Sequence, residues 1–171
     1  MKISQVEAVP ILVPLKAGLT TKTAHGEHID SPYVIVRVHT DEGLIGLGEA
    51  TLAPRWSGET SPSCVAAIRD LLDPALRGAD PRNVRSCLMQ INRALKLNHF
   101  TKAAVEMALW DVAGKAAGQP LYRLLGGKVR ETLPMKMVVG AFEVPKAVAL
   151  AEQFLDWGVC HLKVKVGLDP E

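Results

Sequence analysis

The sequence has few of the features that mark secreted or membrane proteins. It has only three cysteines among 171 residues, Cys64, Cys87 and Cys160. Their odd number and wide spacing indicate neither a disulfide framework nor a metal-ligand pair. No apolar run is long enough to cross a membrane, and the residues after Met1 lack the continuous apolar segment of a signal peptide. We therefore expect reduced cysteines and a cytoplasmic protein that does not bind a membrane.

Blocks of like charge are also missing. Lysine and arginine together number 20, aspartate and glutamate number 18, and no basic cluster stands out. We therefore expect no nucleic-acid partner. Apolar residues make up 48% of the chain, which is enough for a sizeable core. The length suits one domain, or one domain with part of a second.

The first fifty residues are rich in valine, leucine and isoleucine and predict strands. The expected strands cover residues 6–15, 33–40 and 44–50. Asp41-Glu42-Gly43 predicts the tight turn of a hairpin between the second and third strands. Residues 16–30 and 51–59 are predicted as loops, and loops as long as the first are usually functional or disordered.

A helical period follows the strands. Ser61-Pro62 and Asp80-Pro81 each place a capping residue before a proline, a typical helix start. A longer helix is expected over residues 101–117, and Asp111 and Lys115 can pair one turn apart on its outer face. The apolar positions expected to face the core of the two later helices are Val84, Leu88, Ile91 and Leu95, then Val105, Ala108, Leu109, Val112 and Ala116.

The pattern changes again after Gly126-Gly127. A strand is expected over residues 133–139, a helix over 145–157 and a second strand over 161–166. This order predicts parallel pairing through a crossover helix. We therefore place a domain boundary here: an α+β domain over residues 1–127, and the opening of an α/β domain over residues 128–171.

The most informative segment for chemistry is His161-Leu162-Lys163-Val164-Lys165-Val166-Gly167. Alternate side chains of a strand face opposite ways, so Lys163 and Lys165 share one face. Each ammonium group disfavours the charge of the other, and partial burial adds to that, so the pKa of a lysine here is expected to fall. Such a lysine can act as a base near neutral pH. The alternative is an ordinary solvent-exposed strand face.

Two other segments match known motifs only in part. His25-Gly26-Glu27-His28 lacks the spacing that places two histidines on one helical face, so we expect no metal site there. Gly46-Leu47-Gly48 matches the start of a dinucleotide-binding loop, but the third glycine is missing and no helix follows at once.

Three segments together resemble the mandelate racemase and muconate-lactonizing enzyme family of the enolase superfamily. They are the hairpin Thr40–Ala50, the stretch from Ala103 to Lys115 continued through Leu124-Leu125-Gly126-Gly127, and Lys163-Val164-Lys165. Thr101 departs from the small alanine that is usual in the family. The resemblance implies an α+β capping domain, an antiparallel sheet plus helices, over residues 1–127. It also implies that residues 128–171 begin a (β/α) TIM-like barrel, here truncated.

The resemblance also implies a reaction. Family enzymes abstract a proton α to a carboxylate and stabilise the enediolate with Mg²⁺. By resemblance, Lys165 is the acid/base residue, and Lys163 tunes its pKa and contacts the carboxylate of a small substrate. The two capping-domain loops would supply Thr21, His25 and Trp56 as substrate contacts. Full-length members commonly form homo-oligomers.

The resemblance places the metal-binding carboxylates on later barrel strands. Such a barrel takes about 250 residues, and only residues 128–171 follow Gly127. We therefore expect no Mg²⁺ site in this chain alone and an N-terminal fragment of a Mg²⁺-dependent racemase, epimerase or cycloisomerase, inactive by itself. The alternatives are an acid-sugar dehydratase of the same superfamily and a non-catalytic, stand-alone capping module.

Overall fold

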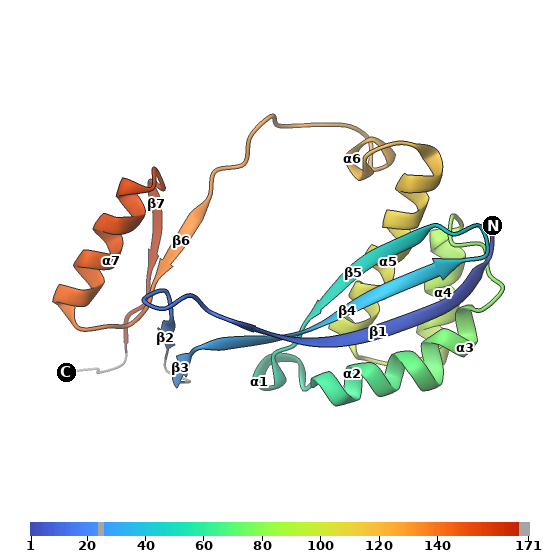
Figure 1. Cartoon of the computed structure of the whole chain (residues 1–171), viewed down its shortest axis with the longest axis horizontal. Coiled ribbons are helices and arrows are strands. Elements are labelled where there is room, and N and C mark those ends of the chain that lie inside the picture. The colour runs from blue at the N-terminus through green and yellow to red at the C-terminus, as the bar shows by residue number, and fades with distance from the viewer. Residues whose placement is uncertain (24–25, 168–171) are drawn as a thin grey trace. The chain divides into compact units, whose positions relative to one another are not determined.

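Three long strands form from the valine-rich segments of the first fifty residues. The computed structural model describes residues 1–23 and 26–167. The strands lie in the order β1-β4-β5, and β4 and β5 pair antiparallel through the predicted turn (Figure 1). The hairpin prediction is confirmed. The bounds are β1 Ile3–Pro14, β4 Asp30–Thr40 and β5 Ile45–Thr51.

The middle strand shows why the sheet has one buried face. Val34, Val36 and Val38 of β4 are fully buried, whereas Arg37 between them is exposed. This alternation follows the two-residue period of a strand. On the opposite, outer face, the carboxylate of Glu7 lies 3.0 Å from Nε2 of His39.

Helices cover the apolar face of the sheet. The first predicted cap is shifted by one residue, because Thr60 and Ser63 form a reciprocal capping box that makes Thr60 the N-cap. The second predicted start is early, since Asp80 accepts the N–H of Arg82 in a turn and the helix begins at Val84. The helices are α1 Pro54–Ser57, α2 Ser61–Ala67, η1 Ile68–Leu72 (a π-helical turn), α3 Asp73–Leu76, α4 Val84–Ala94, α5 His99–Ala117 and α6 Leu121–Leu124.

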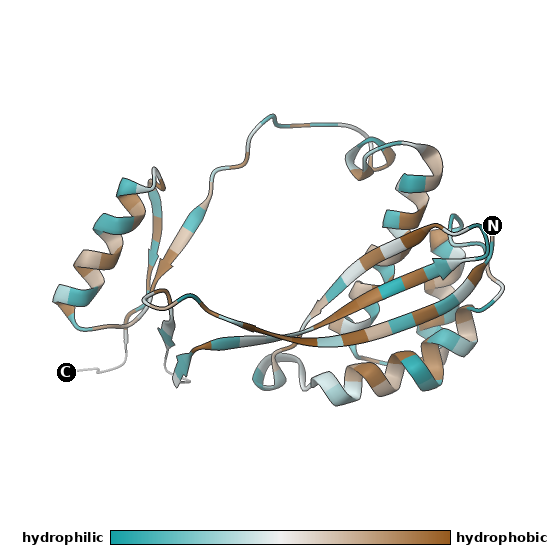
Figure 2. Cartoon of the chain, viewed as in Figure 1, coloured by the Kyte–Doolittle hydropathy of each residue, from teal (hydrophilic) through white to brown (hydrophobic). Residues whose placement is uncertain are grey.

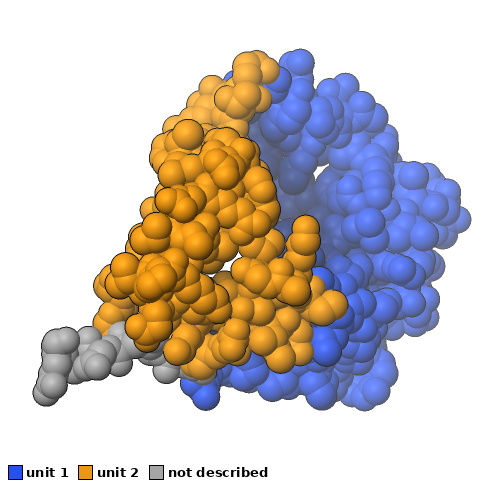
Figure 3. Space-filling model, turned by 60° about the vertical axis from the view of Figure 1, so that its left-hand side comes forward, with its two compact units in different colours: residues 1–13, 32–128 blue, residues 14–31, 129–171 orange. Residues whose placement is uncertain are grey.

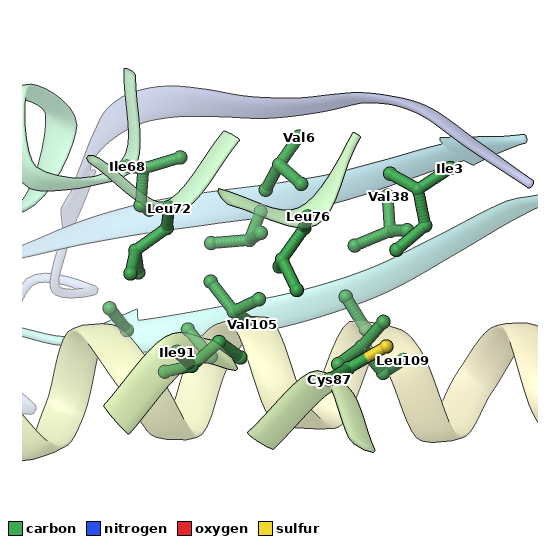
Figure 4. Packing of buried hydrophobic residues seen from close by; sticks show 14 of the residues in the cluster. Ile3, Val6, Val38, Ile68, Leu72, Leu76, Cys87, Ile91, Val105 and Leu109 are labelled. Atoms are coloured by element: carbon green, nitrogen blue, oxygen red, sulfur yellow. The ribbon is translucent and has the colours of Figure 1, made fainter. Parts of the chain in front are cut away.

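The core lies between this sheet and these helices. In Figure 4 the side chains of Val6 and Val38 from the sheet point toward those of Leu72, Ile91 and Leu109 from the helices. Strands and helices thus share one continuous apolar cluster, and this part of the chain is a mixed α+β domain. Four of the five predicted core positions of α5 are buried; the fifth, Ala116, is exposed.

Two glycines let β5 lie directly on α5. A Cβ added at Gly46 would lie 2.0 Å from the carbonyl oxygen of Ala108, and one at Gly48 would lie 1.9 Å from that of Ala104. No side chain fits at either position. The Gly46-Leu47-Gly48 motif therefore serves close strand–helix packing.

The last part of the chain forms a strand–helix–strand unit. β6 and β7 pair in parallel, as predicted, with Val138 opposite Lys163. Leu150 and Phe154 on one face of α7 pack against Val139 of β6, and the polar face of the helix carries the hydrophilic residues seen in Figure 2. The bounds are β6 Lys136–Val139, α7 Val144–Asp156 and β7 His161–Val164.

The chain divides into two compact units, and each unit is built from two separate segments of the sequence. The first unit comprises Met1–Val13 and Pro32–Lys128, and the second comprises Pro14–Ser31 and Val129–Glu171 (Figure 3). The segment predicted as a long loop thus joins the second unit. Two short strands form within it, β2 Thr21–Thr23 and β3 Gly26–His28. Among the described residues, no helix is long and apolar enough to cross a membrane.

Candidate functional site at the carboxyl end of two parallel strands

The predicted lysine pair lies at the end of β7. Lys163 is within the strand, and Lys165 follows the last strand residue. The backbone N–H of Lys165 donates to the carbonyl of Val139 at 2.9 Å, which ties the chain at Lys165 to the end of β6. Lys163 is exposed and Lys165 is half-buried. Because the two residues are two apart on extended backbone, their side chains leave the same face.

The opposite face of β7 is apolar and only partly covered. Leu162 packs with Leu150 and Phe154 of α7. Val164 and Val166 are 57% and 86% exposed. They border an open pocket of about 340 Å³, whose other wall is formed by apolar residues of α7. Within the described part of the chain, this side of the strand therefore lacks further covering residues.

The hairpin of β2 and β3 attaches to the same end of the parallel pair. Thr21 pairs with His28 across the hairpin. The carbonyl of Lys22 accepts the N–H of Ala141 at 3.0 Å, two residues beyond the end of β6. Leu19 packs against the apolar cluster under α7. Thr21 therefore lies in a hairpin held at the carboxyl end of β6, the end that also fixes Lys165.

Gly140 permits this attachment, and sequence reasoning missed it. A Cβ at Gly140 would lie 2.8 Å from the backbone nitrogen of Lys22 and 2.8 Å from the ring of Phe142. Any side chain would push the hairpin away from the strand end. The only sequence signal is a glycine directly after a predicted strand, which does not name its partner.

The carboxyl ends of parallel strands are where α/β proteins build their sites. Side chains that follow neighbouring parallel strands converge at this edge, and loops placed there complete the site. In this unit the edge carries two lysines and a hairpin with threonine and histidine side chains. A cationic edge of this kind can bind an anionic group such as a carboxylate and can offer an amine as a base.

The remaining predicted contacts are Trp56 and His25. Trp56 lies in α1 of the first unit and is 81% exposed. His25 lies outside the described residues. Among the residues that the structure describes, no group of three or more histidines, cysteines, aspartates or glutamates is placed to hold a metal ion.

Comparison with known proteins adds the family context. Residues 5–126 match the family model of the mandelate racemase / muconate lactonizing enzyme N-terminal domain. Among curated proteins, the chain is 30% identical to N-succinyl-L-Arg/Lys racemase of Bacillus cereus over 98% of its length, and 38% identical to L-Ala-D/L-Glu epimerase of Bacillus subtilis over 99%. It is 35% identical over 91% of its length to a chloromuconate cycloisomerase of Cupriavidus pinatubonensis, of which it covers 42%. The chain spans 45% of the racemase and of the epimerase.

Solved structures give the same result. The structure of the Bacillus cereus racemase superposes with a TM-score of 0.93 at 30% identity, over 99% of this chain and 45% of that one. A dipeptide epimerase from Cytophaga hutchinsonii, complexed with Mg and the dipeptide D-Ala-L-Val, superposes with a TM-score of 0.90 at 33% identity, over 98% of this chain and 45% of that one.

Proposed function

Because this chain belongs to the mandelate racemase / muconate lactonizing enzyme family, we propose that it is the N-terminal part of an enzyme that removes a proton α to a carboxylate. Its relatives include racemases, epimerases and cycloisomerases, as well as a D-mannonate dehydratase. The observation that carries the proposal is the lysine pair at the carboxyl end of β7. That edge is the usual catalytic end of parallel strands.

We assign different roles to the two lysines. Lys165, whose chain position is fixed by Val139, is the base that takes the α-proton and returns it as an acid. Lys163, two residues earlier on the same face, contacts the substrate carboxylate with its ammonium group. Thr21, on the hairpin held at the same edge, and Trp56 and His25 are further substrate contacts.

The domain assignment is part of the same proposal. Residues 1–127 form the capping domain, and residues 128–171 begin a (β/α) barrel. The parallel pairing of β6 and β7 around α7 supports this. The exposed Val164 and Val166 support it too, because parallel sheets are normally covered on both faces.

The described residues do not fit a Mg²⁺ site of their own. Some solved relatives are complexes with Mg or magnesium, but the described part of this chain offers no cluster of three carboxylate, imidazole or thiolate groups. The proposed substrate is a small carboxylate, in line with relatives that act on acylated amino acids and dipeptides.

The test uses the natural gene product that contains this chain. The protein is incubated in D₂O with Mg²⁺ and N-succinyl-L-arginine, L-Ala-L-Glu or cis,cis-muconate. A carboxylate that is a substrate should acquire deuterium at its α-carbon. Lys165→Ala should abolish this exchange, and Lys163→Ala should raise the Michaelis constant. Lys96→Ala, an exposed lysine of the first unit, is the matched control. Wild-type exchange in Lys165→Ala would show that the lysine pair is an ordinary strand face.

A further inference from the structure

Glu59 is a buried carboxylate that the proposed chemistry does not use. It is only 3% exposed, yet it lies at the end of the second predicted loop, three residues after Trp56. Burying a carboxylate is costly unless its oxygens are well satisfied by hydrogen bonds. The hydrogen-bond partners of this carboxylate therefore indicate its structural role.

Among the described residues, the hydrogen bonds to the Glu59 carboxylate come from the first turn of α5. Oε1 accepts the N–H of Phe100 at 2.9 Å. Oε2 accepts the N–H of Thr101 at 2.9 Å and the hydroxyl of Thr101 at 2.6 Å. These two N–H groups have no partner within the helix, and the positive end of the helix dipole favours a negative charge there.

Glu59 also replaces a local cap that is absent. Asn98, the residue at the N-cap position of α5, has a left-handed backbone at φ 52° and makes no side-chain capping bond. The carboxylate that caps this helix thus comes from about forty residues earlier in the chain. Thr101 is fully buried, so its hydroxyl serves this bond and not solvent.

Glu59 itself follows directly after the segment that carries Trp56. The hydroxyl of Ser57 accepts the N–H of Glu59 at 3.2 Å, and Gly58 closes α1 in a left-handed conformation. Directly after Glu59, Thr60 caps α2. The short helix α1 contributes no buried residue to the core. The Glu59 carboxylate ties the C-terminal end of this segment to the first turn of α5.

We propose that Glu59 and Thr101 form an anchor that positions the α1 segment and, through it, the exposed indole of Trp56. Glu59 and Thr101 are positioning residues that act through Trp56 and touch no substrate. The role of this anchor in catalysis rests on the proposed function, in which Trp56 contacts the substrate. The anchor itself is a property of the first unit and can be measured without any substrate.

The direct test is amide hydrogen exchange in the whole chain. The amides of Trp56, Ser57 and Gly58 are hydrogen-bonded within α1, to Ala53 and Pro54. Glu59→Gln keeps the size but places an amide NH₂ against an N–H of α5. Exchange of the three amides should rise by roughly tenfold or more, as expected for the loss of a charged hydrogen bond. Glu152→Gln, an exposed glutamate of α7, is the control.

A second pair of variants covers the case in which Glu59→Gln fails to fold. Thr101→Val removes only the hydroxyl, and Thr101→Ser keeps it. Exchange in α1 should rise in the valine variant and return toward wild type in the serine variant. Cys64 gives an independent signal, because its buried thiol lies beside Thr101. Its labelling by a thiol reagent should accelerate in Thr101→Val, whereas labelling of Cys87 should not.

The outcomes separate the anchor from the proposed function. Unchanged exchange of the α1 amides in both Glu59→Gln and Thr101→Val, with α5 still folded, would overturn the anchor. In the natural gene product, Thr101→Val should raise the Michaelis constant severalfold, leave kcat near wild type, and be rescued by Thr101→Ser. Faster α1 exchange with an unchanged Michaelis constant would leave the anchor standing and remove Trp56 from the proposed substrate site.

Discussion

The ammonium group of Lys115 lies 2.7 Å from the carboxylate of Asp111, one turn earlier on α5, and both side chains also bind the backbone of β5. Asp111 accepts the N–H of Leu47 at 2.8 Å, and Lys115 donates to the carbonyl of Ile45 at 2.7 Å. The pair was predicted from its spacing. Its second task, satisfying the free edge of the sheet, was not.

Because of this contact with the backbone, removing the Asp111 side chain should destabilise the fold more than removing one partner of a surface ion pair. Asp111→Ala leaves the N–H of Leu47 and the ammonium of Lys115 without this acceptor, and should lower the free energy of unfolding by about 1 kcal/mol. The melting temperature should fall by roughly 2–4 °C. Asp70→Ala, which removes only the exposed pair with Arg69, should change it little. Equal effects of the two variants in thermal unfolding would contradict the edge role.

The hydrogen bonds of Asp111 and Lys115 to the edge strand β5 have a second consequence. Exposed strand edges pair with other chains unless charges or covering groups prevent it. Ile45 and Leu47, at 40% and 52% exposure, add apolar surface to this edge. Asp111→Ala should therefore increase self-association in sedimentation velocity experiments, whereas Asp70→Ala should not.

The contact of β5 with α5 predicts a strong effect of one methyl group. Gly48→Ala would place a Cβ 1.9 Å from the carbonyl oxygen of Ala104, so the helix and the strand must separate. We expect a loss of roughly 3 kcal/mol or more in urea unfolding, at or above the upper end for overpacked cores.

Gly114→Ala is the matched control for this prediction. Its Cβ would meet only the carbonyl oxygen of Gln119, at 3.0 Å, and its backbone is ordinary helix. Alanine is a better helix former than glycine by about 1 kcal/mol, which offsets the tight contact. The control should therefore stay within about 1 kcal/mol of wild type. A similar small loss in both variants would mean that the strand and helix are free to separate.

Much of the fold could be predicted because it follows local periods. The alternation around Arg37 and the three- and four-residue spacing of Val105, Leu109 and Val112 both reflect one buried face. The core prediction for Ala116 was wrong because the helical period continues to the exposed end of α5, beyond the hydrogen bond of Lys115 with Ile45. The burial of Thr101 was not predicted, because a polar residue is buried there only since a distant carboxylate satisfies it.

The candidate site could also be predicted only in part, for the same reason. The shared face of Lys163 and Lys165 follows from the strand period, which is local. The docking of the β2–β3 hairpin on Gly140 depends on a contact between Lys22 and Ala141, more than a hundred residues apart in the sequence. No period or composition encodes such a contact. The short strands of the hairpin also lack the apolar alternation that would have predicted them.

The carboxyl of Asp80 predicts a specific response to acid. The guanidinium of Arg82 hydrogen-bonds to it at 2.7 Å and, together with the backbone N–H of Arg82, lowers its pKa from 3.8 to about 2. A depressed carboxyl pKa contributes stability above the unfolded value, and this contribution disappears as the pH falls through the folded value. The stability advantage of wild type over Asp80→Asn should therefore be constant above about pH 5 and shrink steadily toward about pH 2.

Urea midpoints measured across this pH range test the assignment. Asp156→Asn, a substitution of an exposed aspartate at the end of α7, is the control, and its difference from wild type should not show the same decline. A wild-type advantage over Asp80→Asn that persists unchanged to pH 2 would mean that the ion pair with Arg82 does not form in solution.

The three cysteines should differ in their reactivity toward a thiol reagent. Cys64 and Cys87 are fully buried in the first unit, whereas Cys160 in the second unit is exposed. Burial raises the pKa of both buried thiols, so the reactive thiolate is scarce as well as inaccessible. With Ellman's reagent near pH 8, one thiol per chain should react quickly and two slowly, at a rate set by opening of the α+β core.

Cys160→Ser identifies the fast thiol and should leave only the slow phase. In the same variant, a destabilising change in the core, such as Gly48→Ala, should accelerate both slow thiols, since each requires the cluster around α5 to open. Thr101→Val should instead accelerate Cys64 alone, because only that thiol lies against the Glu59–Thr101 anchor. A fast reaction of Cys87 in the otherwise unaltered Cys160→Ser chain would contradict the burial on which the core assignment depends.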